Sequence, residues 1–362
     1  MADLYEIDFL QVANKSSADA IVVYYEISGV GRLHVVDAGF RAVGVEVLNH
    51  IDQYHGHGRV IDHALLTHPD GDHAGGMVEV IKSGRVNNLW MLRPWEYADE
   101  LLPRFSTYTS RDRLVSALKS AFPLVCELEK EALENGVQIM DPFQGAWVGQ
   151  FLVLAPTKEH YLNMIVQTGK TPATKEQSLG GLGGVRDMLI GAVKEAVKYV
   201  FMGWGEERFS SEETSEQNEM SVVQYMEIDG QSVILTGDVG RKGLRIAIDY
   251  IKSVGIDLSN LRVFQVPHHG SRRNVESEIL DELLGPRIAD QNRLTGGRFT
   301  AVVSCSKENP NHPRKAVVRA MIHRDGKVLT TEEAHICCSH NMRAREGWGA
   351  ANCLPYPSQQ EE

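Results

Sequence analysis

Cysteine is scarce in this chain, with 5 among 362 residues, and the cysteines are scattered. An odd and dispersed set does not suit a disulfide framework, which favours a reducing compartment and predicts a cytoplasmic location. The N-terminus from Met1 to Glu6 lacks the basic and then apolar layout of a signal peptide. No apolar run is long enough to span a bilayer, so we expect no membrane partner.

Positive charge is also scarce, since the chain has 37 Lys and Arg against 48 Asp and Glu, which gives a net charge of -11. Proteins that cover nucleic acid broadly neutralise its phosphates with basic side chains, so this balance argues against an extended nucleic-acid surface. It leaves room for a local basic groove. The length and the 43% hydrophobic content support a large core, either as one α/β unit or as two domains.

The most informative stretch runs from Thr67 to Gly76, directly after an apolar run at 61–66 that predicts a buried strand. It holds four side chains that can bind metal ions, and each is costly to bury unpaired. A turn at a strand end can direct them to one point, where imidazole and carboxylate ligands suit two divalent cations. The alternative is a polar turn with satisfied side chains. The four residues are His68, Asp70, Asp72 and His73.

The same order of apolar strand, Asp or His, and then Gly or Pro recurs along the chain. Ligands that follow successive strands converge on one edge of a sheet, which is the usual place for a site in α/β proteins. Each instance has an ordinary alternative, namely a helix cap for Asp37, a turn cap for Asp238 and a loop histidine for His312. The repeated residues are Asp37, Asp238, His268, His269 and His312.

The region between the first and later motifs is mostly helical in its pattern from about residue 78 to 136. Arg104, Arg111, Arg113 and Lys119 form a basic patch there, interpreted either as a solvated face or as an edge that steers phosphate. Farther on, Gly180 to Gly184 lacks the strand and the Lys-Ser/Thr pair of a phosphate-binding loop, and a hinge is the better interpretation.

Taken together, these motifs resemble the metallo-β-lactamase superfamily of binuclear metallohydrolases, and most of all the hydrolase domain of the ComEC competence protein family. The resemblance spans about residues 5 to 331. It implies an α/β fold, the αββα sandwich, in which two mixed β-sheets are flanked by helices. Residues 1–335 would form the hydrolase domain, with a helical insertion within 86–215, and 336–362 a C-terminal extension. The motifs lie at 36–39, 67–76, 218–221, 235–238, 267–271, 304 and 309–313.

The chain departs from the superfamily pattern in two places. The usual His-x-His-x-Asp-His has Asp70 in place of its second histidine, and Asn218 lies near the position of a histidine that the superfamily carries. Both changes resemble the ComEC branch and leave the first metal position poorer in nitrogen. Such a position binds more weakly or prefers Mn²⁺ to Zn²⁺.

The resemblance also implies roles for individual residues. His68 and Asp70 would bind the first of two divalent ions, Zn or Mn, and Asp72, His73 and one of the two adjacent histidines the second. Asp238 would bridge the ions and Asp37 would support the site. His268 is narrowly favoured as the ligand and His269 as the residue facing the substrate. Asp72, His269 and His312 would take part in catalysis, and the expected binders of phosphate oxygens are Asn218, Ser271, Ser304 and His312.

This chemistry predicts a metal-dependent phosphodiesterase or nuclease whose metal-bound hydroxide attacks phosphorus, in DNA processing or bacterial defence. Two alternatives stay open. One is a hydrolase of a small phosphodiester or a cyclic nucleotide, which the negative charge tolerates better. The other is a metal-degenerate scaffold subunit that binds a protein partner through the insertion.

Overall fold

The structure is a computed structural model that describes residues 2–12, 15–170 and 198–361. The glycine-rich stretch from Gly180 to Gly184, expected to be a hinge, lies outside the described residues. Two seven-stranded sheets and one two-stranded sheet make up the strands of the described part. Among its helices, none combines the length and the apolar character needed to cross a bilayer.

The first sheet has the strand order β15-β1-β2-β3-β4-β5-β6. Strands β15, β1, β2 and β3 pair antiparallel, and β3, β4, β5 and β6 pair parallel. The β-branched and aromatic residues of β2 suit a buried central strand. The strands are β1 (Leu4–Phe9), β2 (Ala20–Ile27), β3 (Val30–Ala38), β4 (Ile61–Leu65), β5 (Val86–Trp90), β6 (Gln138–Met140) and β15 (Ile336–His340).

The second sheet has the order β14-β13-β12-β11-β10-β8-β7, parallel from β11 to β14 and antiparallel elsewhere. The small third sheet pairs β9 with β16. The strands are β7 (Trp147–Val148), β8 (Phe151–Ala155), β9 (Tyr199–Phe201), β10 (Val223–Ile228), β11 (Gln231–Leu235), β12 (Leu261–Gln265), β13 (Phe299–Val303), β14 (Gly326–Thr330) and β16 (Gln359–Glu361).

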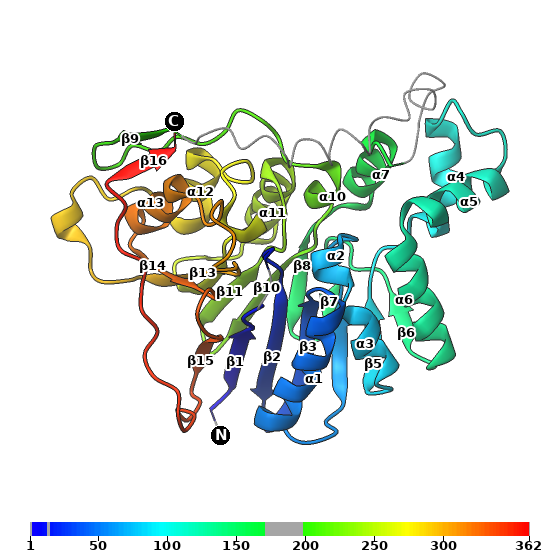
Figure 1. Ribbon diagram of the computed structural model, residues 1–362, viewed down its shortest axis with the longest axis horizontal. Coiled ribbons are helices and arrows are strands. Elements are labelled where there is room, and N and C mark those ends of the chain that lie inside the picture. Colours follow the sequence, from blue (N-terminus) through cyan, green and yellow to red (C-terminus); the bar gives the residue numbers. More distant parts are fainter. Residues whose placement is uncertain (1, 13–14, 171–197, 362) are drawn as a thin grey trace.

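The two large sheets pack face to face, because alternate residues of each strand are apolar and meet in one buried cluster. Phe9 and Val36 of the first sheet share this cluster with Phe151, Leu235 and Val263 of the second. Two further clusters lie between each sheet and its own helices. The predicted αββα sandwich of two mixed sheets flanked by helices is confirmed (Figure 1).

Helices α1, α3 and α6 cover the outer face of the first sheet, and α11, α12 and α13 cover that of the second. The α-helices are α1 (Arg41–Tyr54), α2 (Gly71–Ala74), α3 (Met77–Lys82), α4 (Ala98–Leu101), α5 (Arg111–Ala121), α6 (Pro123–Glu134), α7 (Lys158–Gln167), α10 (Glu216–Glu219), α11 (Arg241–Val254), α12 (Ser277–Leu284) and α13 (Lys315–His323). Short 3₁₀ turns occur at Pro94–Tyr97, Leu102–Arg104, His268–Gly270 and Gln291–Arg293.

The stretch 86–215 contains the expected helices α4 to α7, and it also supplies β5 and β6 to one sheet and β7 and β8 to the other. Its basic patch is largely neutralised within the protein. Arg104 pairs with Glu159, Arg111 with Asp99 and Lys119 with Glu129. These ion pairs favour the solvated-face interpretation of the patch.

The C-terminal stretch belongs to the same sandwich, since β15 pairs with β1 at the edge of the first sheet. Beyond β15, Arg345 reaches back to Asp8 of β1, with Nη1 3.0 Å from Oδ1 and Nη2 2.7 Å from Oδ2. Asp8 is fully buried and also lies 2.8 Å from Nε2 of His50 on α1. This bidentate pair fastens the stretch to the core.

Candidate metal centre

The predicted site residues gather at one edge of the sandwich because they follow parallel strands. Asp37 lies near the end of β3, and the run from His68 to His73 follows β4 and enters α2. Asp238 follows β11, and the histidine pair follows β12. Since the carboxyl ends of parallel strands meet at one edge, residues far apart in the sequence become neighbours here.

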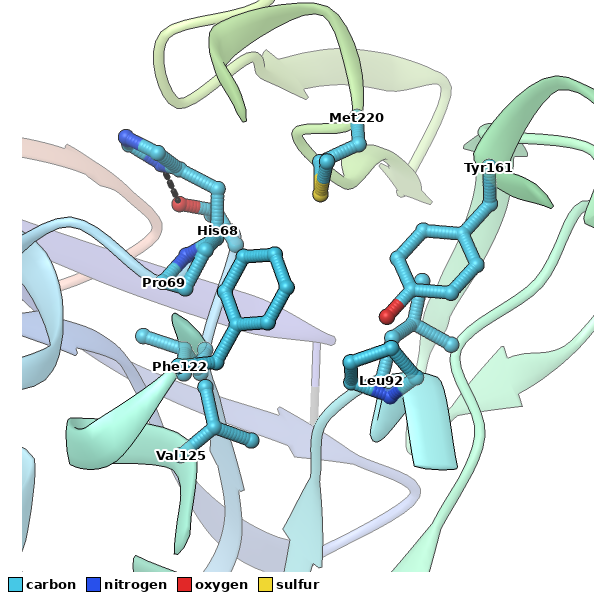
Figure 2. A pocket seen from close by; sticks show the side chains of 10 residues that line it. His68, Pro69, Leu92, Phe122, Val125, Tyr161 and Met220 are labelled. Carbon is cyan, nitrogen blue, oxygen red and sulfur yellow. Dashed lines mark hydrogen bonds between the residues drawn. The ribbon is translucent and has the colours of Figure 1, made fainter. Parts of the chain in front are cut away.

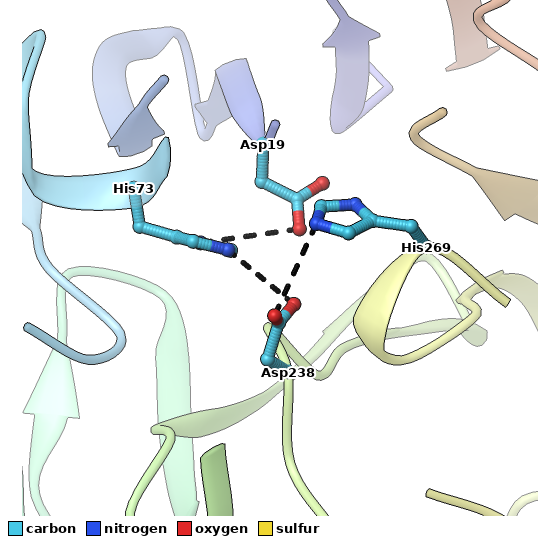
Figure 3. A group of neighbouring side chains, drawn as sticks. All are labelled: Asp19, His73, Asp238 and His269. Atoms are coloured by element: carbon cyan, nitrogen blue, oxygen red, sulfur yellow. Dashed lines mark ion pairs between the residues drawn. The ribbon is translucent and has the colours of Figure 1, made fainter. Parts of the chain in front are cut away.

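Four buried side chains face one another at the centre of this edge, namely Asp19, His73, Asp238 and His269 (Figure 3). One ligand atom of each lies within 4.8 Å of those of the others. Nε2 of His73 is 3.4 Å from Oδ1 of Asp238, and Nε2 of His269 is 4.0 Å from Oδ2 of Asp238. Asp72 adjoins the group, with Oδ2 3.5 Å from Nε2 of His269.

A second group of donors lies around Oδ2 of Asp238. Nε2 of His68 is 3.9 Å from Oδ2 of Asp238 and 3.8 Å from Oδ2 of Asp70. Nε2 of His268 is 3.7 Å from the same Asp238 oxygen. Asp238 is therefore shared by the two groups, which is the arrangement a carboxylate needs to bridge two cations.

The Nδ1 atoms of His73 and His269 make hydrogen bonds that orient Nε2 of each ring toward the centre. Nδ1 of His73 is 2.7 Å from Oδ2 of Asp37, which also accepts the Thr67 hydroxyl at 2.6 Å. Nδ1 of His269 is 2.7 Å from the Ser304 carbonyl oxygen. Metal-binding histidines are oriented in this way, because the bond at one nitrogen fixes the tautomer of the other.

His268 and His68 are oriented by polar neighbours in the same manner. Nδ1 of His268 lies 3.0 Å from Nδ2 of Asn218 and 3.1 Å from Oδ1 of Asn274, and Nδ1 of His68 lies 3.1 Å from the Thr67 hydroxyl oxygen. Asn218, expected to bind phosphate, thus contacts His268. Thr67 and Asn274 were not among the predicted residues.

Several buried polar atoms at the centre have no hydrogen-bond partner in the described part of the chain. Such atoms are costly unless something satisfies them, and bound cations would satisfy these atoms. A nitrogen and oxygen donor set of this kind fits Zn²⁺ or Mn²⁺. The atoms are Nε2 of His68, His73 and His269, Oδ1 of Asp19 and Oδ1 of Asp238.

The protonation of the centre follows from burial and from these close charges. Burial favours neutral His73, but the Asp238 and Asp37 carboxylates hold its pKa well above the usual value. The pKa of His269 is raised to about 9 against burial, by Asp238 and Asp72. Burial raises the pKa of Asp19. Any cation that binds must expel protons from these imidazoles, so its affinity rises with pH.

Asp19 is the site residue that the sequence reasoning missed. It lies just before β2 between Ala18 and Ala20, is 1% exposed, and has Oδ2 4.0 Å from Nδ1 of His73. The available signal was a carboxylate directly before the apolar first half of a strand, where burial without a partner is costly. No His or Gly accompanies it, so it does not match the pattern of the other motifs.

The two adjacent histidines take opposite sides. His269 lies next to Asp72 and His73, whereas His268 lies next to Asp238 and the His312 ring. The sequence slightly favours His268 as the ligand beside Asp72 and His73, and in the structure the histidine beside these two residues is His269. Both residues have positive φ, 48° and 54°, which turns their side chains apart.

The other predicted residues surround this centre. The His312 ring is 6.0 Å from that of His268 and 6.3 Å from that of His269, between ring centroids. Burial, and then the charges of His269 and His268, lower the pKa of His312 to about 3. Ser304 contributes its carbonyl to His269, and the Ser271 hydroxyl accepts the Arg273 backbone N–H at 3.2 Å.

The surroundings differ on the two sides of the centre. Beside His68 lies an apolar cleft of about 20 Å³, lined among others by Leu92, Phe122, Tyr161 and Met220 (Figure 2). That volume holds one water molecule. Beside His312 lies a groove of about 540 Å³, whose lining includes Lys307, Asn309, Lys315 and Tyr356. A nucleotide-sized group therefore has room only on the His312 side of these two.

No protein-family profile matches the chain. The chain is 29% identical over 118 residues to ComE operon protein 3 of Bacillus subtilis (strain 168), a match that covers 32% of this chain. The same match covers 13% of that protein, so the chain corresponds to a small part of this relative. The similarity agrees with the ComEC-type resemblance of the motifs.

Two solved structures are similar over most of the chain. The metallo-beta-lactamase fold protein YhfI from Bacillus subtilis is 9% identical, with a TM-score of 0.42, and the match covers 93% of this chain and 100% of that one. Igni18, a metallo hydrolase from the archaeon Ignicoccus hospitalis, is 11% identical, with a TM-score of 0.39 and coverage of 94% and 100%. The αββα sandwich of the described part is the architecture that the resemblance of the motifs predicted.

Proposed function

We propose that this protein is a metal-dependent phosphodiesterase that cleaves nucleic acid. The observation that carries the proposal is the set of buried, partnerless nitrogen and oxygen atoms around Asp238. Divalent ions such as Zn²⁺ or Mn²⁺ supply, when bound, an activated water and positive charge beside the scissile phosphate. In the proposal the first position is held by His68, Asp70 and His268, the second by Asp19, Asp72, His73 and His269, and Asp238 is common to both.

The protein's own residues support the reaction by orientation and hydrogen bonding. Asp72 is 28% exposed in its side chain, so it can both face the centre and accept a hydrogen bond from an attacking water. Asn309 lies with Nδ2 3.3 Å from Nδ1 of His312, and this contact leaves the proton of the neutral ring on Nε2. We assign that N–H to a phosphate oxygen, where it stabilises charge that develops in the transition state.

Nucleic acid is preferred to a small phosphodiester because of the groove beside His312. Its volume of about 540 Å³ and Lys315 in its lining suit a strand that extends past the reacting phosphate, whereas Lys307 in the same lining pairs with Glu333. A scaffold without metal is disfavoured, because such a role gives no reason to keep the donors around Asp238 buried and unsatisfied. We place the activity in the cytoplasm, in DNA processing or bacterial defence.

Metal analysis combined with a substrate screen tests the proposal. We expect about two bound ions per chain and cleavage of single-stranded DNA. The screen compares bis-p-nitrophenyl phosphate, single- and double-stranded DNA, RNA and cyclic dinucleotides. Fewer than one bound ion with no rescue by Mn²⁺ would favour the scaffold, and turnover of cyclic dinucleotides alone would favour the small-substrate alternative.

A further inference from the structure

The loops on the His312 side of the centre carry arginines next to the site residues. Arg272 and Arg273 follow Ser271, and Arg314 comes two residues after His312. The two loops are locked together, because the Arg314 backbone N–H donates to the Gly270 carbonyl at 3.0 Å. Gly270 has a φ of +83°, and a Cβ there would lie 2.7 Å from the Pro313 side chain. The backbone of Arg314 is thus fixed against the loop of His268 and His269.

The Arg314 side chain is half-buried, yet it makes no hydrogen bond or ion pair with any of the residues that the structure describes. The neighbouring carboxylate of Glu361 is already engaged, since it accepts the backbone N–H groups of Lys315 at 2.9 Å and Ala316 at 3.2 Å. Burial lowers the pKa of Arg314, the Glu361 carboxylate opposes that shift, and the charges of Arg272 and Arg273 add to it.

Other buried arginines of the chain have hydrogen-bond acceptors for their guanidinium groups. Arg324 donates to the carboxylates of Glu207 and Asp281, and Arg319 donates to carbonyl oxygens such as that of Pro357. Arg273, beside Arg314, pairs with Glu212. A guanidinium that is partly desolvated, held near like charges and not hydrogen-bonded to an anion is unfavourable by itself. An anion from outside the chain would make it favourable, and a planar fork of this kind suits phosphate.

We propose that Arg314 binds a second phosphate of the substrate, adjacent to the one that is cleaved, so that a strand with several phosphates is preferred to an ester with one. This inference rests on the proposed function and names its substrate class, the oligonucleotide. In this reading Arg314 is a positioning residue, because it holds the strand without touching the reacting atoms. Its loss weakens binding of the ground state and the transition state equally, and so raises KM and leaves kcat unchanged.

The test compares substrates with one and two phosphates, TpT and TpTpT, in the wild type and in Arg314→Gln. We expect the variant to raise KM for TpTpT about tenfold, with little change for TpT or for bis-p-nitrophenyl phosphate. Arg314→Lys should recover part of the loss. Arg293→Gln is the matched control. It removes the same charge from an exposed arginine before β13, at the opposite end of that strand from Ser304.

A second measurement separates this inference from the proposed function. Binding of a hydrolysis-resistant phosphorothioate oligothymidylate, followed by fluorescence anisotropy, should weaken about tenfold in Arg314→Gln and not in Arg293→Gln. If wild-type protein cleaves DNA but the variant binds and cleaves both substrates as wild type does, the inference fails and the function stands. If no phosphodiester is cleaved yet Arg314→Gln alone weakens binding, the anion site stands and the function fails.

Discussion

The two candidate metal positions share Asp238 but differ in burial and in donors. The second position combines two buried histidines with the fully enclosed Asp19 and with Asp72. The first has one buried histidine, and its other donors reach solvent, with side-chain exposures of 31% for Asp70 and 29% for His268. Low dielectric strengthens charge interactions, so the buried position should hold its ion tightly and the open one should exchange it.

The largest effect is expected from the second position. His73→Ala removes a buried donor next to Asp238, so turnover of any phosphodiester should fall by more than about a thousandfold while the circular dichroism spectrum is retained. His57→Ala is the control, since that histidine side chain is 93% exposed. Near-normal turnover in His73→Ala would contradict the metal mechanism.

A buried polar cluster away from the centre provides a contrast, because its charges are satisfied without any ion. Oε1 of Glu207 lies 2.8 Å from both Nδ1 of His323 and Nη1 of Arg324. Burial opposes ionisation, but these partners lower the pKa of Glu207 from 4.5 to about 2. The stabilisation is therefore complete above pH 4.5 and is lost as the pH falls towards 2.

Glu207→Gln should accordingly lower the free energy of unfolding at neutral pH by about 3 kcal/mol and flatten its acid dependence. Urea unfolding between pH 3 and 7 measures this effect. Chelators should leave the difference between wild type and variant unchanged. If chelators changed the difference in unfolding free energy between wild type and variant, this cluster would be coupled to the metal centre.

Asp19→Asn sharpens the comparison between the two positions. The amide keeps the shape of the side chain but removes its charge from the buried position, so affinity for that ion should fall about ten- to a hundredfold. Competition with a calibrated chelator measures the change. Asp70→Asn is the counterpart and should weaken the open position alone. Equal losses at both positions in Asp19→Asn would show that Asp19 does not distinguish them.

The smallest effect is expected at the open position. Nζ of Lys170 lies 3.5 Å from Oδ1 of Asp70, where an ammonium group competes with a cation for the same carboxylate. Both groups are partly exposed and solvent weakens their attraction, so Lys170→Gln should tighten binding of the more weakly held ion only about two- to fivefold. Titration of Mn²⁺ followed by electron paramagnetic resonance tests this, and weaker binding in the variant would exclude competition by Lys170.

Much of the centre could be predicted from the sequence, because its residues follow apolar strands in a repeated local pattern. His68, Asp72, His73 and Asp238 are such residues, and a short polar turn after a buried strand has few places to point other than the sheet edge. The sandwich was predicted from the resemblance of these motifs. Asp19 could not be recognised, since its partners come from other strands and nothing beside it in the sequence signals them.

The sequence by itself determined most of the side chains that gather at the edge, Asp19 excepted, since strand periodicity and polar strand ends are local properties of the chain. Only the tertiary structure decided how they divide between two positions. The left-handed backbone at His268 and His269, the burial of Asp19 and the placement of Arg314 next to Arg272 and Arg273 all depend on packing between distant segments. Packing between distant segments decides which residue lies next to a given charge, and the spacing of residues along the sequence does not indicate that neighbour.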